Sequence, residues 1–335
     1  MKLAVALTGF WILRGHASEG RRHVDAALAL PPVQQSALAQ AWALYTGAAL
    51  AENQGDHETA SAMLERCLAL RRALGNPVEI AATLSTLALA RLQAGDAERA
   101  ADCEVEALNL FASVDDLRGQ AIGWLHLGQI RLWAGDTEAA LDDLDRALVF
   151  AREIANREVE AECELTAAEA HLRDGRAERA ASAARRSLDI CLEAGDKRGE
   201  ACATWWLGRI GVQQRQAATA RLQLQQALSD FSGHDMRAQM LGCLDDLSQV
   251  MLEAGEPASG YTLATAVDQS RRRLKLHRSP WDESRWQALL QRLRSALSPA
   301  AAEQAARTGR EWETDDAVQA ALAETAMPTM IVGGV

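Results

Sequence analysis

The chain has 335 residues, of which 48% are apolar, and its 46 acidic residues outnumber its 35 Lys and Arg to give a formal net charge of −11. An acidic chain repels phosphate backbones and anionic lipid surfaces, so this composition argues against binding to nucleic acid or to a membrane. No apolar run has the length needed to cross a bilayer. The six cysteines form no CxxC pair, which is typical of buried thiols in a reducing compartment.

The N-terminal stretch allows two interpretations. MKLAVAL, an apolar run through Leu13 and the small pair Ala17-Ser18 have the outline of a secretory signal peptide, but the stretch can also be the first helix of a folded domain. A recurring glycine decides between them, because it appears every 40 residues at Gly15, Gly55, Gly95, Gly135 and Gly175, and again two steps later at Gly255. Since Gly15 belongs to this series, we interpret the stretch as the first repeat and expect a cytoplasmic protein.

Each repeat is predicted to be a helix, a tight turn, a second helix and a loop. The glycine ends the first helix because it can adopt the left-handed conformation, and the polar residue after it suits the start of the second helix. Five positions after the glycine stands a small residue that lets two helices cross closely: Gly20, Ala60, Ala100, Ala140, Ala180, Ala220 and Gly260. Arg215 replaces glycine in the sixth repeat, so we predict that this turn avoids the left-handed conformation or is the weakest joint of the array.

The repeats carry a family resemblance. Leu127-Gly128 before the turn, Gly135-Asp136 at it, and Ala140 after it resemble a tetratricopeptide repeat (TPR), although the ordinary repeat has 34 residues. The longer form, led by FWILRGHASEGRRHVDAAL, resembles the C-terminal sensor region of MalT-like and LuxR-type regulators, which are ATP-dependent signalling proteins of bacteria. This resemblance implies an all-α, right-handed superhelix of about seven antiparallel helix hairpins.

The C-terminal part is expected to cover the last apolar face. Ser279–Leu297 is predicted to form a helix with Pro280 in its first turn, and Thr314 is predicted to cap a later helix within Gly309–Leu322. We therefore expect a repeat array over 1–278, a helical cap over 279–326 and a flexible tail over 327–335.

No motif indicates catalysis. The sequence lacks the phosphate loop GxxxxGK[ST], HExxH and GxSxG, and its histidines are not spaced as zinc ligands. Glu160, Glu162 and Glu164 are interpreted as a solvated helix face. We expect a chain that is not an enzyme and that has no cofactor and no metal.

The resemblance to TPR proteins implies where a partner binds, because the first helix of each TPR hairpin lines a concave groove. Transferring the groove positions by the glycine register gives Trp42, Tyr45, Asn53, Gln93, Gln129, Trp133, Glu169, Arg173, Trp205, Arg209 and Gln213. The alternative is that some tryptophans, Trp124 and Trp206 in particular, belong to the core.

We therefore predict a scaffold whose groove binds a protein, a peptide or a small effector, as the sensor part of a bacterial transcriptional or signalling regulator. The alternative is a structural module that self-associates through its outer faces or cap helices. The basic run Arg271–Arg278 could contact nucleic acid, but solvated cations at a helix C-terminus are the simpler interpretation.

Overall fold

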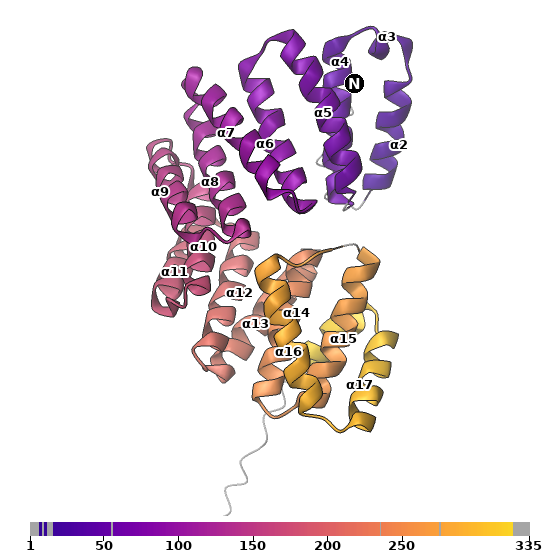
Figure 1. The fold of residues 1–335 in the computed structure, drawn as a ribbon, viewed down its shortest axis with the longest axis vertical. Coiled ribbons are helices and arrows are strands. Elements are labelled where there is room, and N and C mark those ends of the chain that lie inside the picture. Colours follow the sequence, from indigo (N-terminus) through magenta and orange to yellow (C-terminus); the bar gives the residue numbers. More distant parts are fainter. Residues whose placement is uncertain are drawn as a thin grey trace, which may run out of the picture. The chain divides into compact units, whose positions relative to one another are not determined.

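The computed structural model describes residues 7–8, 10–11, 16–54, 56–234, 236–274 and 276–323. These residues form seventeen α-helices and no β-strand, in two compact units, Met1–Asp174 and Gly175–Val335 (Figure 1). The helices of the first unit are α2 (Ala17–Leu28), α3 (Pro31–Gln34), α4 (Ala37–Asn53), α5 (His57–Leu74), α6 (Pro77–Gln93), α7 (Ala97–Ser113), α8 (Leu117–Ala134), α9 (Thr137–Glu153) and α10 (Arg157–Arg173). The helices of the second unit are α11 (Ala177–Ala194), α12 (Lys197–Gln213), α13 (Ala217–Gly233), α14 (Arg237–Glu253), α15 (Pro257–Leu274), α16 (Pro280–Ser295), α17 (Pro299–Glu311) and α18 (Thr314–Ala323).

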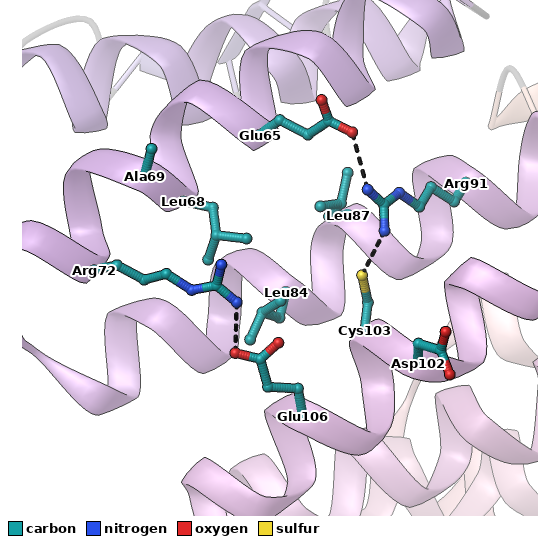
Figure 2. A pocket seen from close by; sticks show the side chains of 10 residues that line it. All are labelled: Glu65, Leu68, Ala69, Arg72, Leu84, Leu87, Arg91, Asp102, Cys103 and Glu106. Atoms are coloured by element: carbon teal, nitrogen blue, oxygen red, sulfur yellow. Dashed lines mark hydrogen bonds and ion pairs between the residues drawn. The ribbon is translucent and has the colours of Figure 1, made fainter.

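Helix hairpins build both units, which confirms the expected all-α repeat fold. In the first unit α4 packs against α5, α6 against α7, and α8 against α9, while in the second unit α12 packs against α13 and α14 against α15. An ion pair joins the second helices α5 and α7, between Arg72 and Glu106 at 2.6 Å (Figure 2). Within the described ranges, no helix combines the length and apolar character that a membrane span needs. The expected domain limits of 1–278, 279–326 and 327–335 remain a proposal, and the tail lies outside the described residues.

The turn between the two helices of a hairpin follows the sequence prediction. Gly95 and Gly135 have φ of +87° and +91°, in the left-handed region that glycine adopts without strain. Asp136 then accepts a hydrogen bond at 3.2 Å from the N–H three residues later, which caps α9. The corresponding Gly15 and Gly55 lie outside the described residues. Arg215 has φ of +60°, so the prediction that its turn avoids the left-handed conformation is wrong.

The column of small residues lies where the two helices of a hairpin meet, as α8 and α9 do. Its alanines have no exposed surface: Ala60, Ala100, Ala140, Ala180 and Ala220. A Cβ on Gly128, in α8, would lie 3.2 Å from the carbonyl oxygen of Ala140 in α9. The small residues are therefore required by close helix packing.

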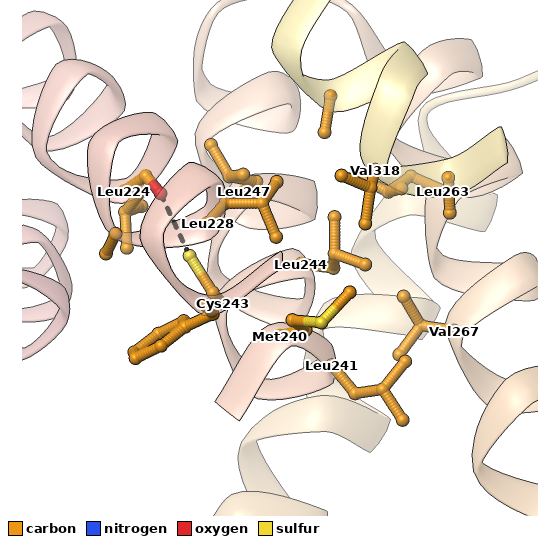
Figure 3. Packing of buried hydrophobic residues seen from close by; sticks show 14 of the residues in the cluster. Leu224, Leu228, Met240, Leu241, Cys243, Leu244, Leu247, Leu263, Val267 and Val318 are labelled. Carbon is orange, nitrogen blue, oxygen red and sulfur yellow. Dashed lines mark hydrogen bonds between the residues drawn. The ribbon is translucent and has the colours of Figure 1, made fainter. Parts of the chain in front are cut away.

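The last three helices cover the final hairpin of the second unit. Val318 of α18 enters a core cluster with side chains of α13, α14 and α15 (Figure 3). α17 packs closely on α15, since a Cβ on Gly309 would lie only 2.3 Å from the carbonyl oxygen of Thr262. Thr314 is the first residue of α18 and not its cap. Its Oγ1 instead lies 3.0 Å from Ser270 Oγ on α15, so it links the two helices.

Candidate functional site

The predicted groove residues of the first unit lie on the first helices of its hairpins, α4, α6, α8 and α10. Polar side chains connect each helix to the next one along. Tyr45 Oη and Thr86 Oγ1 are 3.0 Å apart between α4 and α6, and Gln129 Nε2 donates to Glu162 Oε1 at 3.0 Å between α8 and α10. Because the bonded residues are about one repeat apart in sequence, these contacts hold one face of successive first helices in register. We call this surface the first-helix face.

Trp42 and Tyr45 flank a buried arginine. The guanidinium carbon of Arg71, on α5, lies 5.0 Å from the ring centroid of Trp42 and 4.7 Å from that of Tyr45. Arg71 is 2% exposed and donates to Thr83 Oγ1 at 2.7 Å and to the carbonyl oxygen of Glu79 at 3.0 Å. Cation–π contacts of this kind favour a fixed ring orientation. The half-buried rings therefore form an ordered aromatic surface, and the buried arginine behind them was not foreseen from the sequence.

The other candidates in the first unit differ in exposure. Asn53 and Gln93 are exposed at the C-terminal ends of α4 and α6, whereas Trp133 is half-buried against a core cluster. Arg173 pairs with Glu169 and donates to a backbone carbonyl of α8, so its charge is engaged within the chain. The role of these residues in binding remains a prediction.

Trp205 and Arg209 belong to a closed cluster in the second unit. Arg209 is 4% exposed, and its Nε donates at 2.8 Å to Asp246 Oδ2, the same oxygen that accepts from Trp205 Nε1 at 2.8 Å. Asp282, on α16, lies 3.2 Å from Arg209 Nη1. Helix α16 therefore covers the arginine, which neutralises a buried carboxylate and is not part of an open groove. Gln213, one turn later, is exposed.

The two tryptophans proposed as core residues differ from each other. Trp206 is 7% exposed and lies 4.8 Å from the guanidinium carbon of Arg209, so the core interpretation is confirmed for it. Trp124 is half-buried, and Arg146 of α9 lies 4.7 Å from its ring centroid. Its ring packs against a core cluster of α8, α9 and α10 and lies under the arginine, so it is at the edge of the core.

Two arginines of the basic run Arg271–Arg278 belong to an internal network, whereas Arg272 and Arg273 between them are exposed. Arg271 and Arg278 each have a nitrogen 2.9 Å from Asp245, and Arg278 also lies 3.9 Å from the ring centroid of Trp286. Both arginine side chains are at most 10% exposed. The interpretation as solvated cations is therefore wrong for these two residues, which attach α16 to α14 and α15.

The three glutamates of α10 also have different surroundings. Glu160 and Glu164 are buried, and Arg152 of α9 lies 3.0 Å and 3.6 Å from their carboxylates. The solvated-face interpretation is therefore wrong for these two and holds only for Glu162, which is exposed. Among the residues that the structure describes, no group of three or more His, Cys, Asp or Glu is arranged to hold a metal ion.

A cavity of about 370 Å³ lies on the opposite side of the hairpins, between the second helices α5 and α7 and above α6. We call it the α5–α7 cavity. Its lining residues are Glu65, Leu68, Ala69, Arg72, Leu84, Leu87, Arg91, Asp102, Cys103 and Glu106 (Figure 2). Burial raises the pKa of the Cys103 thiol, although Arg91 beside it favours the thiolate. The thiol is therefore neutral at pH 7, and sequence reasoning missed this site because no motif marks it.

Comparisons with known proteins give structural matches only. No protein-family model matches the sequence, and the search of curated proteins finds no relative. The chain is similar to the apo form of RapI, with a TM-score of 0.61 at 12% identity over 93% of this chain and 99% of that one. It is also similar to a Rap protein complexed with Competence and Sporulation Factor, with a TM-score of 0.60 at 13% identity over 84% of this chain and 81% of that one.

A third match is PH0952 from Pyrococcus horikoshii, a signal transduction ATPase with numerous domains that has a tetratricopeptide repeat sensor. The TM-score is 0.55 at 16% identity, over 80% of this chain and 44% of that one. At these identities the likeness shows the fold alone, which is a TPR-like helical repeat.

Proposed function

We propose that this chain is a non-catalytic TPR scaffold and that a protein or peptide binds along the first-helix face of the first unit. The observation that carries the proposal is the contact between successive first helices, Tyr45 with Thr86 and Gln129 with Glu162. Side chains that are ordered before a partner arrives lose less conformational entropy on binding. Aromatic side chains such as Trp42 and Tyr45 are also enriched among the residues that dominate binding energy.

The charge of the first unit indicates the kind of partner. Residues 1–174 contain 26 Asp and Glu against 15 Lys and Arg, a net charge of −11, whereas residues 175–335 contain 20 of each. The whole net charge of the chain therefore lies in the unit that carries the proposed face. Complementary charge accelerates association and selects partners, so we expect a basic protein or peptide.

The wider role is proposed to be that of a sensor or interaction module in a bacterial regulator in the cytoplasm. Two structural matches support this role: the Rap protein in complex with Competence and Sporulation Factor, and PH0952 with its TPR sensor. In such a regulator, a partner that binds one conformation of the array more tightly than another shifts the population toward it.

A displayed library of random peptides tests the proposed face. We expect the selected peptides to be rich in Lys and Arg and to bind the Trp133→Ala chain at least tenfold more weakly than the wild type. The matched control is Leu74→Ala, which truncates an apolar side chain that is 44% exposed on α5. Equal helicity by circular dichroism excludes unfolding. Acidic peptides, or unchanged affinity for Trp133→Ala, would contradict the proposal.

The alternative is an oligomerisation module that acts through its outer faces or cap helices. Val149 of α9 and Leu222 of α13 favour it, because each is an apolar side chain that is 64% exposed on a second helix. Light scattering of the full chain and of the Val149→Asp and Leu222→Asp variants tests it. A mass that falls to that of a monomer, with peptide binding intact, would support the alternative.

A further inference from the structure

We propose that the α5–α7 cavity binds a small amphipathic cation, that is, an apolar body carrying one ammonium or guanidinium group. The cavity volume of about 370 Å³ lies in the range of small-molecule sites, roughly 300–1,000 Å³. The proposal is independent of the proposed function, because the cavity lies between the second helices α5 and α7 and none of its lining residues is among those of the first-helix face.

The floor of the cavity is apolar. Leu84 and Leu87 of α6 are each 1% exposed, Leu68 of α5 is 7% exposed, and the neutral thiol of Cys103 on α7 adds a polarisable surface. Figure 2 shows these side chains between the charged residues of the rim. An apolar group placed there would be removed from water without leaving a buried polar group unpaired.

The rim determines the charge of the ligand. Arg91 lies 2.9 Å from Glu65, and Arg72 lies 2.6 Å from Glu106, so each guanidinium already faces a carboxylate. Asp102 adds a third carboxylate to the rim, which leaves the lining with one net negative charge. This charge and the net charge of −11 on the whole first unit favour the binding of a cation. An anion would have to displace a glutamate from its arginine.

The next repeat has larger side chains at two of the equivalent positions. Forty residues after Leu84 stands Trp124, and forty after Glu106 stands Arg146, whose guanidinium carbon lies 4.7 Å from the Trp124 ring centroid. The larger ring and the arginine over it occupy the positions that frame the cavity in the preceding repeat. Copying these two residues into the preceding repeat is therefore expected to fill the cavity.

Three probes with the same apolar chain test the proposal: octylammonium and octanoate, each below its micelle concentration, and octanol below its solubility limit. In isothermal titration calorimetry of the full chain, octylammonium should bind most tightly, octanol more weakly and octanoate most weakly. The Leu84→Trp/Glu106→Arg variant copies the arrangement of the next repeat, so it should keep the fold and bind octylammonium at least tenfold more weakly. A circular dichroism melt of this variant checks the fold.

The charge of the rim is tested with a matched pair. Asp102→Asn should weaken the binding of octylammonium about three- to fivefold. The control is Asp142→Asn, the same substitution at the equivalent exposed position of the next repeat, which should leave the affinity for octylammonium unchanged. Tighter binding of octanoate, equal effects of the two Asn substitutions, or unchanged affinity in the cavity-filling variant would each overturn the proposal.

Discussion

At the level of single residues, Arg209 and Asp246 form a buried ion pair inside the second unit. Both side chains are at most 5% exposed, and α16 adds Asp282 and Arg285 around them. Removing one member of a buried pair leaves the other charge without compensation. We therefore expect Arg209→Ala to lower the free energy of unfolding by about 3 kcal/mol in urea denaturation. Arg307→Ala, which removes an exposed pair with Glu303, should cost less than about 1 kcal/mol. Equal losses for the two variants would contradict this role.

The second prediction concerns Asp143 and the pH dependence of the unfolding free energy. Its side chain in α9 has no exposed surface, and burial raises its pKa to about 6 although Arg131 and Arg146 favour the charged form. Between about pH 4 and pH 6 the folded chain keeps a proton that the unfolded chain has lost, so stability falls as pH rises through this window. A difference of about two pKa units corresponds to about 3 kcal/mol. The unfolding free energy of the wild type relative to Asp143→Asn should fall by that amount from pH 4 to pH 7, and a constant difference would contradict the assignment.

At the level of helices and turns, Arg215 is the exception to the glycine register. It adopts φ of +60°, where a residue with a Cβ is strained by about 1 kcal/mol. We expect Arg215→Gly to raise the free energy of unfolding by about 0.5–1 kcal/mol, since glycine also gains freedom in the unfolded chain. We also expect faster hydrogen exchange in residues 213–217 than in residues 134–138 of the wild type. If the Arg215→Gly variant were no more stable than the wild type, the backbone at Arg215 would not be strained.

Local features of helices and turns could be predicted from the sequence, whereas contacts between distant helices could not. Gly135 and Asp136 were placed correctly because a turn and a helix cap depend on residues within one or two turns. The burial of Arg209 could not be predicted, because it depends on Asp282, more than seventy residues later. The α5–α7 cavity was missed for a related reason, since its volume depends on how side chains from three helices meet and Leu84 by itself is an ordinary core residue.

At the level of the whole molecule, charge is distributed unevenly between two units of the same fold. The first unit carries the full net charge of −11, and the second is neutral. A large net charge opposes the compact state through self-repulsion, and salt screens that repulsion beyond a Debye length of about 10 Å at 0.1 M. Added salt should therefore stabilise the first unit more than the second.

Hydrogen exchange of the full chain tests this difference, because it reports on both units in one sample. Raising NaCl from about 0.02 M to about 0.5 M should slow exchange of the most protected amides of α6 and α8 about fivefold, which corresponds to about 1 kcal/mol. Amides of α12 and α14 serve as the internal reference and should slow by less than about twofold, since their unit has no net charge and its buried pairs are shielded from the solvent ions. An equal response of the two units would mean that local ion pairs, and not net charge, govern their stability. The expectation of a basic partner for the first-helix face would then lose its electrostatic support.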